Sequence, residues 1–251
     1  MAEQDAQIAA LIELHRGLER QGPGDAAFSR RILAGLPALP ANPGIADLGC
    51  GGGAGALLLA EWFGVPVRAV DLSREFLDEL EAQAKQRGLA HLVEPIEADF
   101  GQLDWPAGTI DLLWSEGAAY NLGFATALRQ WRPLLARGGI AVISELSWFG
   151  DDVPAPARTY WAQAYPEIGS EAENIAHAVA EGFTVLGVSR LPAAAWWHNY
   201  YGPLQARIDA LRGQADAAMQ AVIRETEAEI ALFRDYSDVY GYAFYVLRAR
   251  D

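Results

Sequence analysis

Short apolar runs alternate with segments of helical periodicity along most of the chain beyond Ile45. This alternation is typical of βαβ units, in which helices cover both faces of a parallel sheet. The runs that qualify as strands span residues 45–48, 67–71, 92–97, 110–115, 140–145, 184–190 and 242–247. Helices fit between the first five strands at about 53–63, 74–87 and 123–135. The pattern therefore predicts an α/β fold.

Two helices are expected before the sheet. The first carries its recurring positions at Ile8, Leu11, Ile12, His15 and Leu18. It should end at Gly22-Pro23-Gly24, and Asp25 can then cap a second helix that runs to about Leu36. These segments would form a helical cover in front of the sheet.

The last third of the chain departs from the regular alternation. Residues 151–166 are rich in proline and aromatics, and residues 171–181 follow with a helical pattern. A longer helical segment is expected at 204–233, with one buried side formed by Met219, Val222, Ile223, Thr226, Ile230 and Phe233. We expect two insertions in one fold rather than a second domain.

Composition narrows the function classes. The 33 acidic and 19 basic residues give a formal net charge of −14, which would repel a phosphate backbone, so nucleic acid is not an expected partner. No apolar stretch approaches the length of a membrane span, and Met1–Ala10 does not resemble a signal peptide. A cytoplasmic protein without a membrane partner is therefore expected. With one cysteine, Cys50, and no metal-ligand spacing among the histidines, no metal is expected.

The segment from Asp47 to Gly53 leaves a predicted strand, turns through glycines and enters a helix. Glycine tolerates the turn and allows a ligand to approach the backbone, where the free amides of a helix start can bind a carboxylate. The next strand ends at Asp71, and an acid there can accept hydrogen bonds from the hydroxyls of a ribose. Together these features predict a nucleoside site.

The glycine spacing Gly49-x-Gly51-x-x-Ala54 also satisfies the dinucleotide fingerprint of NAD-dependent oxidoreductases. Two observations favour another nucleoside cofactor. Asp47 would oppose a pyrophosphate but could meet an ammonium group. A helical excursion between the last two strands also suits a sheet with an antiparallel final strand better than the dinucleotide fold.

The same residues resemble motifs I and II of the class I S-adenosylmethionine methyltransferases, through Asp47–Gly53 and Val70–Ser73. Further resemblances to this family lie at Glu97–Phe100, Asp111–Gly117 and Trp131–Gly139. The resemblance implies a three-layer Rossmann-like sandwich with a seven-stranded, mostly parallel sheet and an antiparallel last strand. It also implies S-adenosyl-L-methionine as the cofactor. The implied cofactor-binding residues are Asp47, Gly49, Gly51, Gly53, Asp71, Leu72, Asp99, Phe100 and Ser115.

Residues 196–204 and 236–244, and the turn at residues 20–24, are similar to a group of bacterial methyltransferases of undefined substrate. If this similarity holds, the turn at residues 20–24 would fold over the cofactor. The alternative interpretation is that it only connects two helices. The resemblance thus specifies the cofactor and leaves the substrate open.

The acceptor pocket is expected beyond the carboxyl end of the fourth strand. Glu116 is the leading candidate for a general base, although it could instead serve as a structural cap, and His198 is a second candidate. Candidate substrate residues are Tyr120, Trp148, Trp161, Trp197 and Tyr200, whose rings could stack on an aromatic acceptor or hold a cationic amine.

We therefore predict a single methyltransferase domain over residues 1–251, with a helical cover (1–44), a cofactor-binding core (45–146) and a C-terminal part with helical insertions over the substrate site (147–251). The predicted activity is direct in-line methyl transfer to a small molecule. An NAD-dependent oxidoreductase and a non-catalytic cofactor-binding protein are the alternatives, and a homodimer is an assembly that the sequence leaves open.

Overall fold

The structure, a computed structural model, describes residues 2–250 and has an eight-stranded sheet within them. Seven strands follow the order β3-β2-β1-β4-β5-β8-β7, and a short strand β6 pairs with β5. The strands are β1 (Ile45–Leu48), β2 (Val67–Asp71), β3 (Val93–Glu97), β4 (Ile110–Ser115), β5 (Leu135–Trp148), β6 (Gly169–Ser170), β7 (Phe183–Arg190) and β8 (Tyr240–Ala249). Only β8 runs antiparallel to its neighbours, which confirms the predicted fold class.

Helices connect most of these strands. They are α1 (Ala2–His15), α2 (Ala26–Ala34), α3 (Ala54–Phe63), α4 (Arg74–Gln86), α5 (Phe124–Trp131), α6 (Ala155–Ala164), α7 (Glu171–Ala180), α8 (Ala193–Trp196), α9 (Gly202–Arg212) and α10 (Ala217–Tyr236). Short 3₁₀-helices η1 (Ala119–Asn121) and η2 (Arg132–Leu134) flank α5, and the π-helix η3 (Trp197–Tyr201) joins α8 to α9. The Asp25 side chain caps α2, as the sequence predicts.

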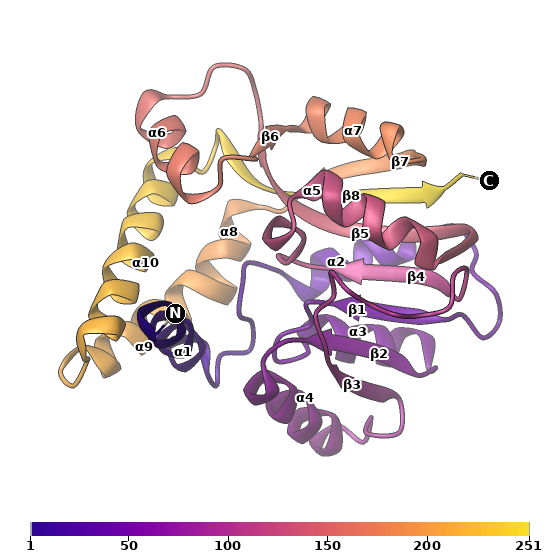
Figure 1. Cartoon of the computed structure of the whole chain (residues 1–251), viewed down its shortest axis with the longest axis horizontal. Coiled ribbons are helices and arrows are strands. Elements are labelled where there is room, and N and C mark those ends of the chain that lie inside the picture. Colours follow the sequence, from indigo (N-terminus) through magenta and orange to yellow (C-terminus); the bar gives the residue numbers. More distant parts are fainter. Residues whose placement is uncertain (1, 251) are drawn as a thin grey trace.

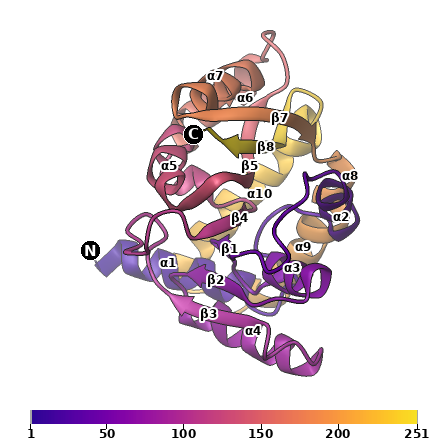
Figure 2. The same ribbon diagram turned by 90° about the vertical axis from the view of Figure 1, so that its right-hand side faces the viewer.

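The period of two along each strand sorts the apolar side chains into two cores. In β4, Leu112 and Trp114 face one core while Leu113 faces the other. The first core also contains residues of α2, α3 and α4, and the second contains residues of α5 and α7. Figure 2 shows α5 on one side of the sheet and α2 and α3 on the other. The three layers follow from this alternation.

The C-terminal third is more regular than its sequence suggests. The fifth and last strands extend beyond the predicted 140–145 and 242–247, because β5 and β8 pair along nine consecutive positions, from Ile140–Arg248 to Trp148–Tyr240. The proline-rich segment contains α6, and β6 was not predicted because two residues carry no periodic signal. The predicted helix 123–135 ends as an α-helix at Trp131, before Pro133.

The helices α1, α9 and α10 form a layer beyond the end of the sheet. Figure 1 shows them on the side toward which the arrow of β4 points, while the arrow of β8 points the opposite way. The predicted face of α10 is buried at Met219, Val222, Ile223, Ile230 and Phe233. Within residues 2–250, none of the helices combines the length and the apolar composition that crossing a membrane requires.

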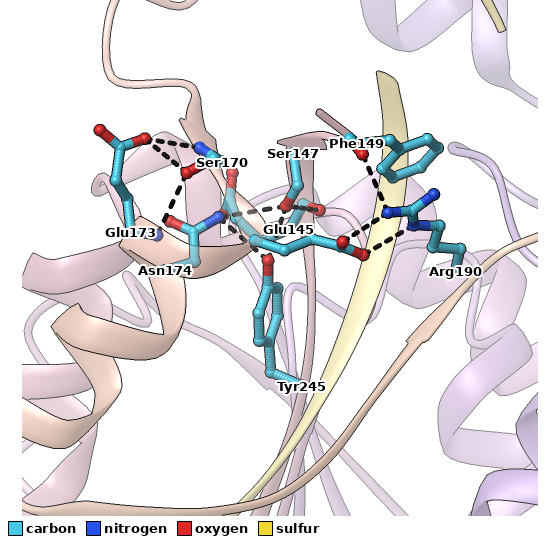
Figure 3. A network of polar contacts seen from close by, with 9 residues as sticks. Glu145, Ser147, Phe149, Ser170, Glu173, Asn174, Arg190 and Tyr245 are labelled. Carbon is cyan, nitrogen blue, oxygen red and sulfur yellow. Dashed lines mark hydrogen bonds and ion pairs between the residues drawn. The ribbon is translucent and has the colours of Figure 1, made fainter. Parts of the chain in front are cut away.

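A polar network fastens α7 to the ends of β5 and β8 (Figure 3). The hydroxyls of Ser147 and Tyr245 lie 2.8 Å apart, and the Asn174 amide donates to both. In the same region Glu145 is 1% exposed, and its Oε1 accepts from the backbone amide of Leu146. Burial raises the pKa of Glu145 to about 8.

This raised pKa makes stability depend on pH. Between the unfolded value of 4.5 and about 8 the folded Glu145 holds a proton that the unfolded chain has lost, so stability is present at lower pH and falls as pH rises. From about pH 6 to about pH 9, this one group should remove on the order of 2 to 3 kcal/mol from the free energy of unfolding.

We expect Glu145→Gln to remove that part of the pH dependence, measured by urea denaturation at several pH values. Glu94→Gln, an exposed change on β3, is the control and should keep the wild-type slope. Equal slopes for wild type and Glu145→Gln would contradict the assignment.

Candidate functional site

One cavity of about 810 Å³ lies at the carboxyl ends of β1, β2 and β4. Its wall comes from α1, the turn at residues 20–23, the glycine-rich turn, the ends of β2 and β3, the segment 116–122, the π-helix η3 and α10. The crevice beyond the carboxyl ends of parallel strands is where ligands bind in folds of this kind. Helices of the N-terminal and C-terminal thirds therefore enclose the site that the sheet creates.

The glycine-rich turn has a positive φ at Gly49, Gly51 and Gly53, where glycine is favoured, and the first two lie at the cavity. Gly49 has φ 75°, and a Cβ atom there would lie 2.2 Å from the Cβ of Ala118. Gly51 has φ 51° and its backbone amide donates to Asp71 at 2.8 Å. A side chain at either position would be strained and would fill the cavity wall.

The carboxylates of Asp71 and Asp99 are fixed by hydrogen bonds and can still accept more. Each Asp71 oxygen accepts one backbone amide, Oδ2 from Gly51 at 2.8 Å and Oδ1 from Ser73 at 2.9 Å. Burial raises the pKa of Asp71, and these amides lower it in part. Asp99 accepts from the Gly101 amide and from the Gln102 side chain. A carboxylate has about four lone-pair sites, so both can also accept from a nucleoside.

Asp47 is a buried carboxylate in the cavity wall. It is 2% exposed, and its Oδ2 has no hydrogen-bond donor within the described chain. Burial raises the pKa of Asp47 well above its usual range, and the nearby charges of Glu116 and Asp71 raise it further. Because Asp47 lines the cavity, an ammonium group bound there would supply a countercharge to this carboxylate. The residues present therefore fit the methionine end of S-adenosylmethionine.

The carboxylate of Glu116 binds the N-terminal cover to the sheet. Its Oε2 accepts from Arg20 at 2.8 Å, and its Oε1 accepts from Ser29 at 2.8 Å and from the Trp114 indole at 2.9 Å. The Arg20 and Glu116 side chains are 8% and 10% exposed. With both oxygens engaged by three donors, Glu116 is placed as an anchor and not as a free proton acceptor.

The turn at residues 20–24 does fold over the glycine-rich turn. The side-chain oxygen of Gln21 accepts a hydrogen bond from the backbone amide of Gly52 at 2.6 Å, and the side-chain amide of Gln21 donates to the backbone carbonyl of Leu18. From the other side, Asn199 of η3 donates to the Gly24 carbonyl at 2.9 Å and to Asp25. The π-helix therefore fixes the cover in place.

At the far end of the cavity, α10 presents Glu229. Its Oε1 accepts from the Tyr201 hydroxyl at 2.6 Å. Burial raises the pKa of Glu229. The sequence does mark this residue. Glu229 follows Thr226 by three positions and precedes Phe233 by four, so it falls on the predicted buried face of its helix. Burying a carboxylate there costs free energy unless it has a binding partner.

The structure brings most of the expected cofactor residues together. Those that line the cavity are Asp47, Gly49, Gly51, Asp71, Leu72, Asp99 and Phe100. Two do not: Ser115 is fully buried and donates to the Leu48 carbonyl, and Gly53 faces Leu80 of α4. Both support the turn from behind.

Of the expected acceptor-site residues, Glu116, Tyr120 and Tyr200 line the cavity. Trp148, Trp161 and Trp197 are instead packed behind the wall, because each ring contacts Tyr240 or Phe233. These tryptophans join α6, η3 and α10 to the end of the sheet. His198 is exposed on η3 and outside the cavity lining. Among residues 2–250, no three His, Cys, Asp or Glu side chains are grouped as a metal site.

The core of the chain matches a known family. Residues 45–139 match the family model described as a methyltransferase domain. The chain is 28% identical over 148 residues to the sarcosine/dimethylglycine N-methyltransferase of Halorhodospira halochloris, covering 57% of this chain and 53% of that protein. It is 30% identical over 95 residues to the geranyl diphosphate 2-C-methyltransferase of Saccharopolyspora erythraea, covering 38% and 33%. The chain thus matches about half or less of the length of these relatives.

Solved structures resemble the whole chain. An S-adenosylmethionine-dependent methyltransferase from Geobacter sulfurreducens, in complex with S-adenosylhomocysteine, has a TM-score of 0.82 at 19% identity and covers 96% of this chain and 98% of its own. YjhP from E. coli has a TM-score of 0.81 at 19% identity, with 96% and 99% covered. The [4+2]-cyclase SpnF has a TM-score of 0.76 at 21% identity, with 100% and 97% covered. These likenesses show the shared fold.

Substitutions in the buried Arg20–Glu116 ion pair test whether it holds the N-terminal cover to the sheet. We expect Arg20→Met and Glu116→Gln each to cost about 3 kcal/mol or more of unfolding free energy, because each leaves a buried charge without its partner. The double variant should lose at least about 1 kcal/mol less than the sum of the two. Urea denaturation measures all three.

The control is Arg16→Met, which removes the exposed ion pair with Glu13 and should cost less than about 1 kcal/mol. An Arg20→Met variant no less stable than Arg16→Met would show that the pair does not hold the cover.

Proposed function

Since the chain carries an S-adenosylmethionine-dependent methyltransferase domain, we propose that it transfers the methyl group of S-adenosylmethionine to a small-molecule acceptor. The observation that carries this proposal is the row of carboxylates along one cavity. Asp47, Asp71 and Asp99 lie in its wall together with the glycine-rich turn. They suit the ammonium, the ribose hydroxyls and the adenine amino group of one ligand.

Each carboxylate would orient one part of the cofactor. Asp47 would pair with the ammonium, Asp71 would accept from the ribose, and Asp99 would accept from the adenine amino group, with Phe100 against the ring. When bound, the cofactor supplies a methyl group that a sulfonium has already activated. The chain then has to align the acceptor with that methyl and keep water out, as the enclosure by α1 and the 20–23 turn allows.

A small acceptor fits both the enclosure and the charge. The cavity of about 810 Å³ would hold both cofactor and acceptor, and α1 and α10 contribute to its wall. A net charge of −14 opposes a nucleic acid acceptor. The named relatives act on dimethylglycine or geranyl diphosphate, which are small molecules. A cytoplasmic location and a homodimer remain parts of this proposal.

The two alternatives have different requirements. An NAD-dependent oxidoreductase would place a pyrophosphate at the glycine-rich turn, next to the buried Asp47, where two negative charges would repel each other. A non-catalytic protein would bind the cofactor and release no S-adenosylhomocysteine. The same fold also occurs in a [4+2]-cyclase, so turnover with an acceptor has to be measured directly.

The test of cofactor binding is calorimetry with S-adenosylmethionine and S-adenosylhomocysteine. We expect Asp71→Asn to weaken both about 10-fold or more, because it removes a charged acceptor from the ribose. Asp104→Asn, an exposed change outside the cavity, is the matched control and should bind like wild type.

No binding of either ligand by folded wild-type protein would overturn the proposed function. Binding of NADH, followed by its fluorescence, together with no S-adenosylmethionine binding would favour the oxidoreductase.

A further inference from the structure

The acceptor end of the cavity is built around the carboxylate of Glu229. Glu229 lies on α10 and lines the cavity together with Thr226 of the same helix. One oxygen, Oε1, accepts from the Tyr201 hydroxyl at 2.6 Å. Within residues 2–250 the structure gives Oε2 no hydrogen-bond donor, and the residue lines the cavity. Glu229 can therefore bind a ligand directly.

Tyrosine side chains share the cavity wall with this carboxylate. Tyr120 of η1 and Tyr200 of η3 line the same cavity, and Gly117, which also lines it, lies against the Tyr242 side chain of β8. Burial raises the pKa of all three hydroxyls, and the negative charge of Glu229 raises each of them further. Electron-rich ring faces beside a carboxylate form a site that attracts a cation.

The orientation of Tyr200 is fixed. Burial lowers the pKa of His15, so its ring is neutral near pH 7, and it donates from Nδ1 to the Leu11 carbonyl at 2.8 Å. Its Nε2 then accepts from the Tyr200 hydroxyl at 3.0 Å. The histidine and tyrosine rings also stack, with centroids 5.8 Å apart. This contact turns the Tyr200 hydroxyl toward α1 and holds its ring at the cavity.

The charge of the cavity is not balanced at this end. Among the described residues that line it, Arg20 is the one Lys or Arg, and it is already paired with Glu116. His15 is neutral, as described above. Glu229 thus has no cationic partner of its own, and a desolvated carboxylate without one is costly. A ligand that brings a positive charge would remove this cost.

We propose that the acceptor end binds an aliphatic amine, with its nitrogen at Glu229 and between the rings of Tyr120 and Tyr200. This inference rests on the proposed function, because it names the acceptor class of the same cavity. The carbon part of the amine would lie against Ile8, Leu11 and Ile12, the apolar residues that α1 contributes to the wall.

The transfer step balances with the groups present. An amine that arrives protonated first gives one proton to Glu229, which exposes the nitrogen lone pair. The nitrogen then forms the new N–C bond with the methyl group, while the electron pair of the broken C–S bond stays on sulfur as a neutral thioether. Any proton that remains on the methylated nitrogen leaves later with the ammonium product.

The test uses choline and its neutral carbon isostere 3,3-dimethylbutan-1-ol, because the two probes share a shape and differ in charge. Their affinities are measured by calorimetry with saturating S-adenosylhomocysteine. We expect wild type to bind choline about 10-fold or more tighter than the isostere. Glu229→Gln should bring the two affinities within about 2-fold, because it keeps the shape and removes the charge.

The matched control is Glu225→Gln, one turn earlier on α10, where the side chain is exposed and outside the cavity lining. This variant should keep the wild-type preference. Equal or undetectable binding of both probes by wild type would overturn the amine site, as would an unchanged preference in Glu229→Gln.

A separate titration with S-adenosylhomocysteine alone distinguishes the two proposals. Binding of this ligand without a choline preference rejects the amine acceptor and leaves the proposed function standing. Failure of S-adenosylhomocysteine to bind rejects the proposed function, and the amine acceptor with it.

Discussion

The buried carboxylate of Glu116 is the contact on which the enclosure of the site depends. It stands at the end of β4 and accepts from Arg20, Ser29 and Trp114, so it joins the N-terminal cover to the sheet. The next residue of the cover, Gln21, then reaches the glycine-rich turn at Gly52. Without this anchor the sheet would keep its crevice, but the cover would lose its charged link to the end of β4.

Enclosure changes the electrostatics of what it covers. Carboxylates on an open sheet edge would be solvated, whereas burial raises the pKa of Asp47, Asp71 and Glu229. We propose that each is thereby prepared for a ligand group that stabilises its charged form: an ammonium at Asp47, hydroxyls at Asp71 and an amine at Glu229. By this proposal the cavity favours cationic and hydrogen-bond-donating ligands, and the burial that the cover causes contributes to that preference.

The aromatic residues divide into two groups that their sequence does not separate. Tyr120 and Tyr200 line the cavity, whereas Trp148, Trp161 and Trp197 pack around Tyr240 and Phe233 behind it. Composition marks all five equally as candidates. Their roles differ because the pairing of β5 with β8 directs Trp148 and Tyr240 into a common aromatic core, to which α6 and α10 attach.

The sequence by itself determined the order of strands and helices, the glycine-rich turn and the acids at Asp47, Asp71 and Asp99, because these depend on local periodicity and on backbone angles open to glycine. It also determined the buried face of α10. Only the tertiary structure decided that Glu116 anchors the cover, that His198 stands outside the site, and that Glu229 faces the acceptor end. These roles depend on contacts between residues as far apart as Arg20 and Glu116 or His15 and Tyr200, and no local pattern encodes which distant side chain will satisfy a buried charge.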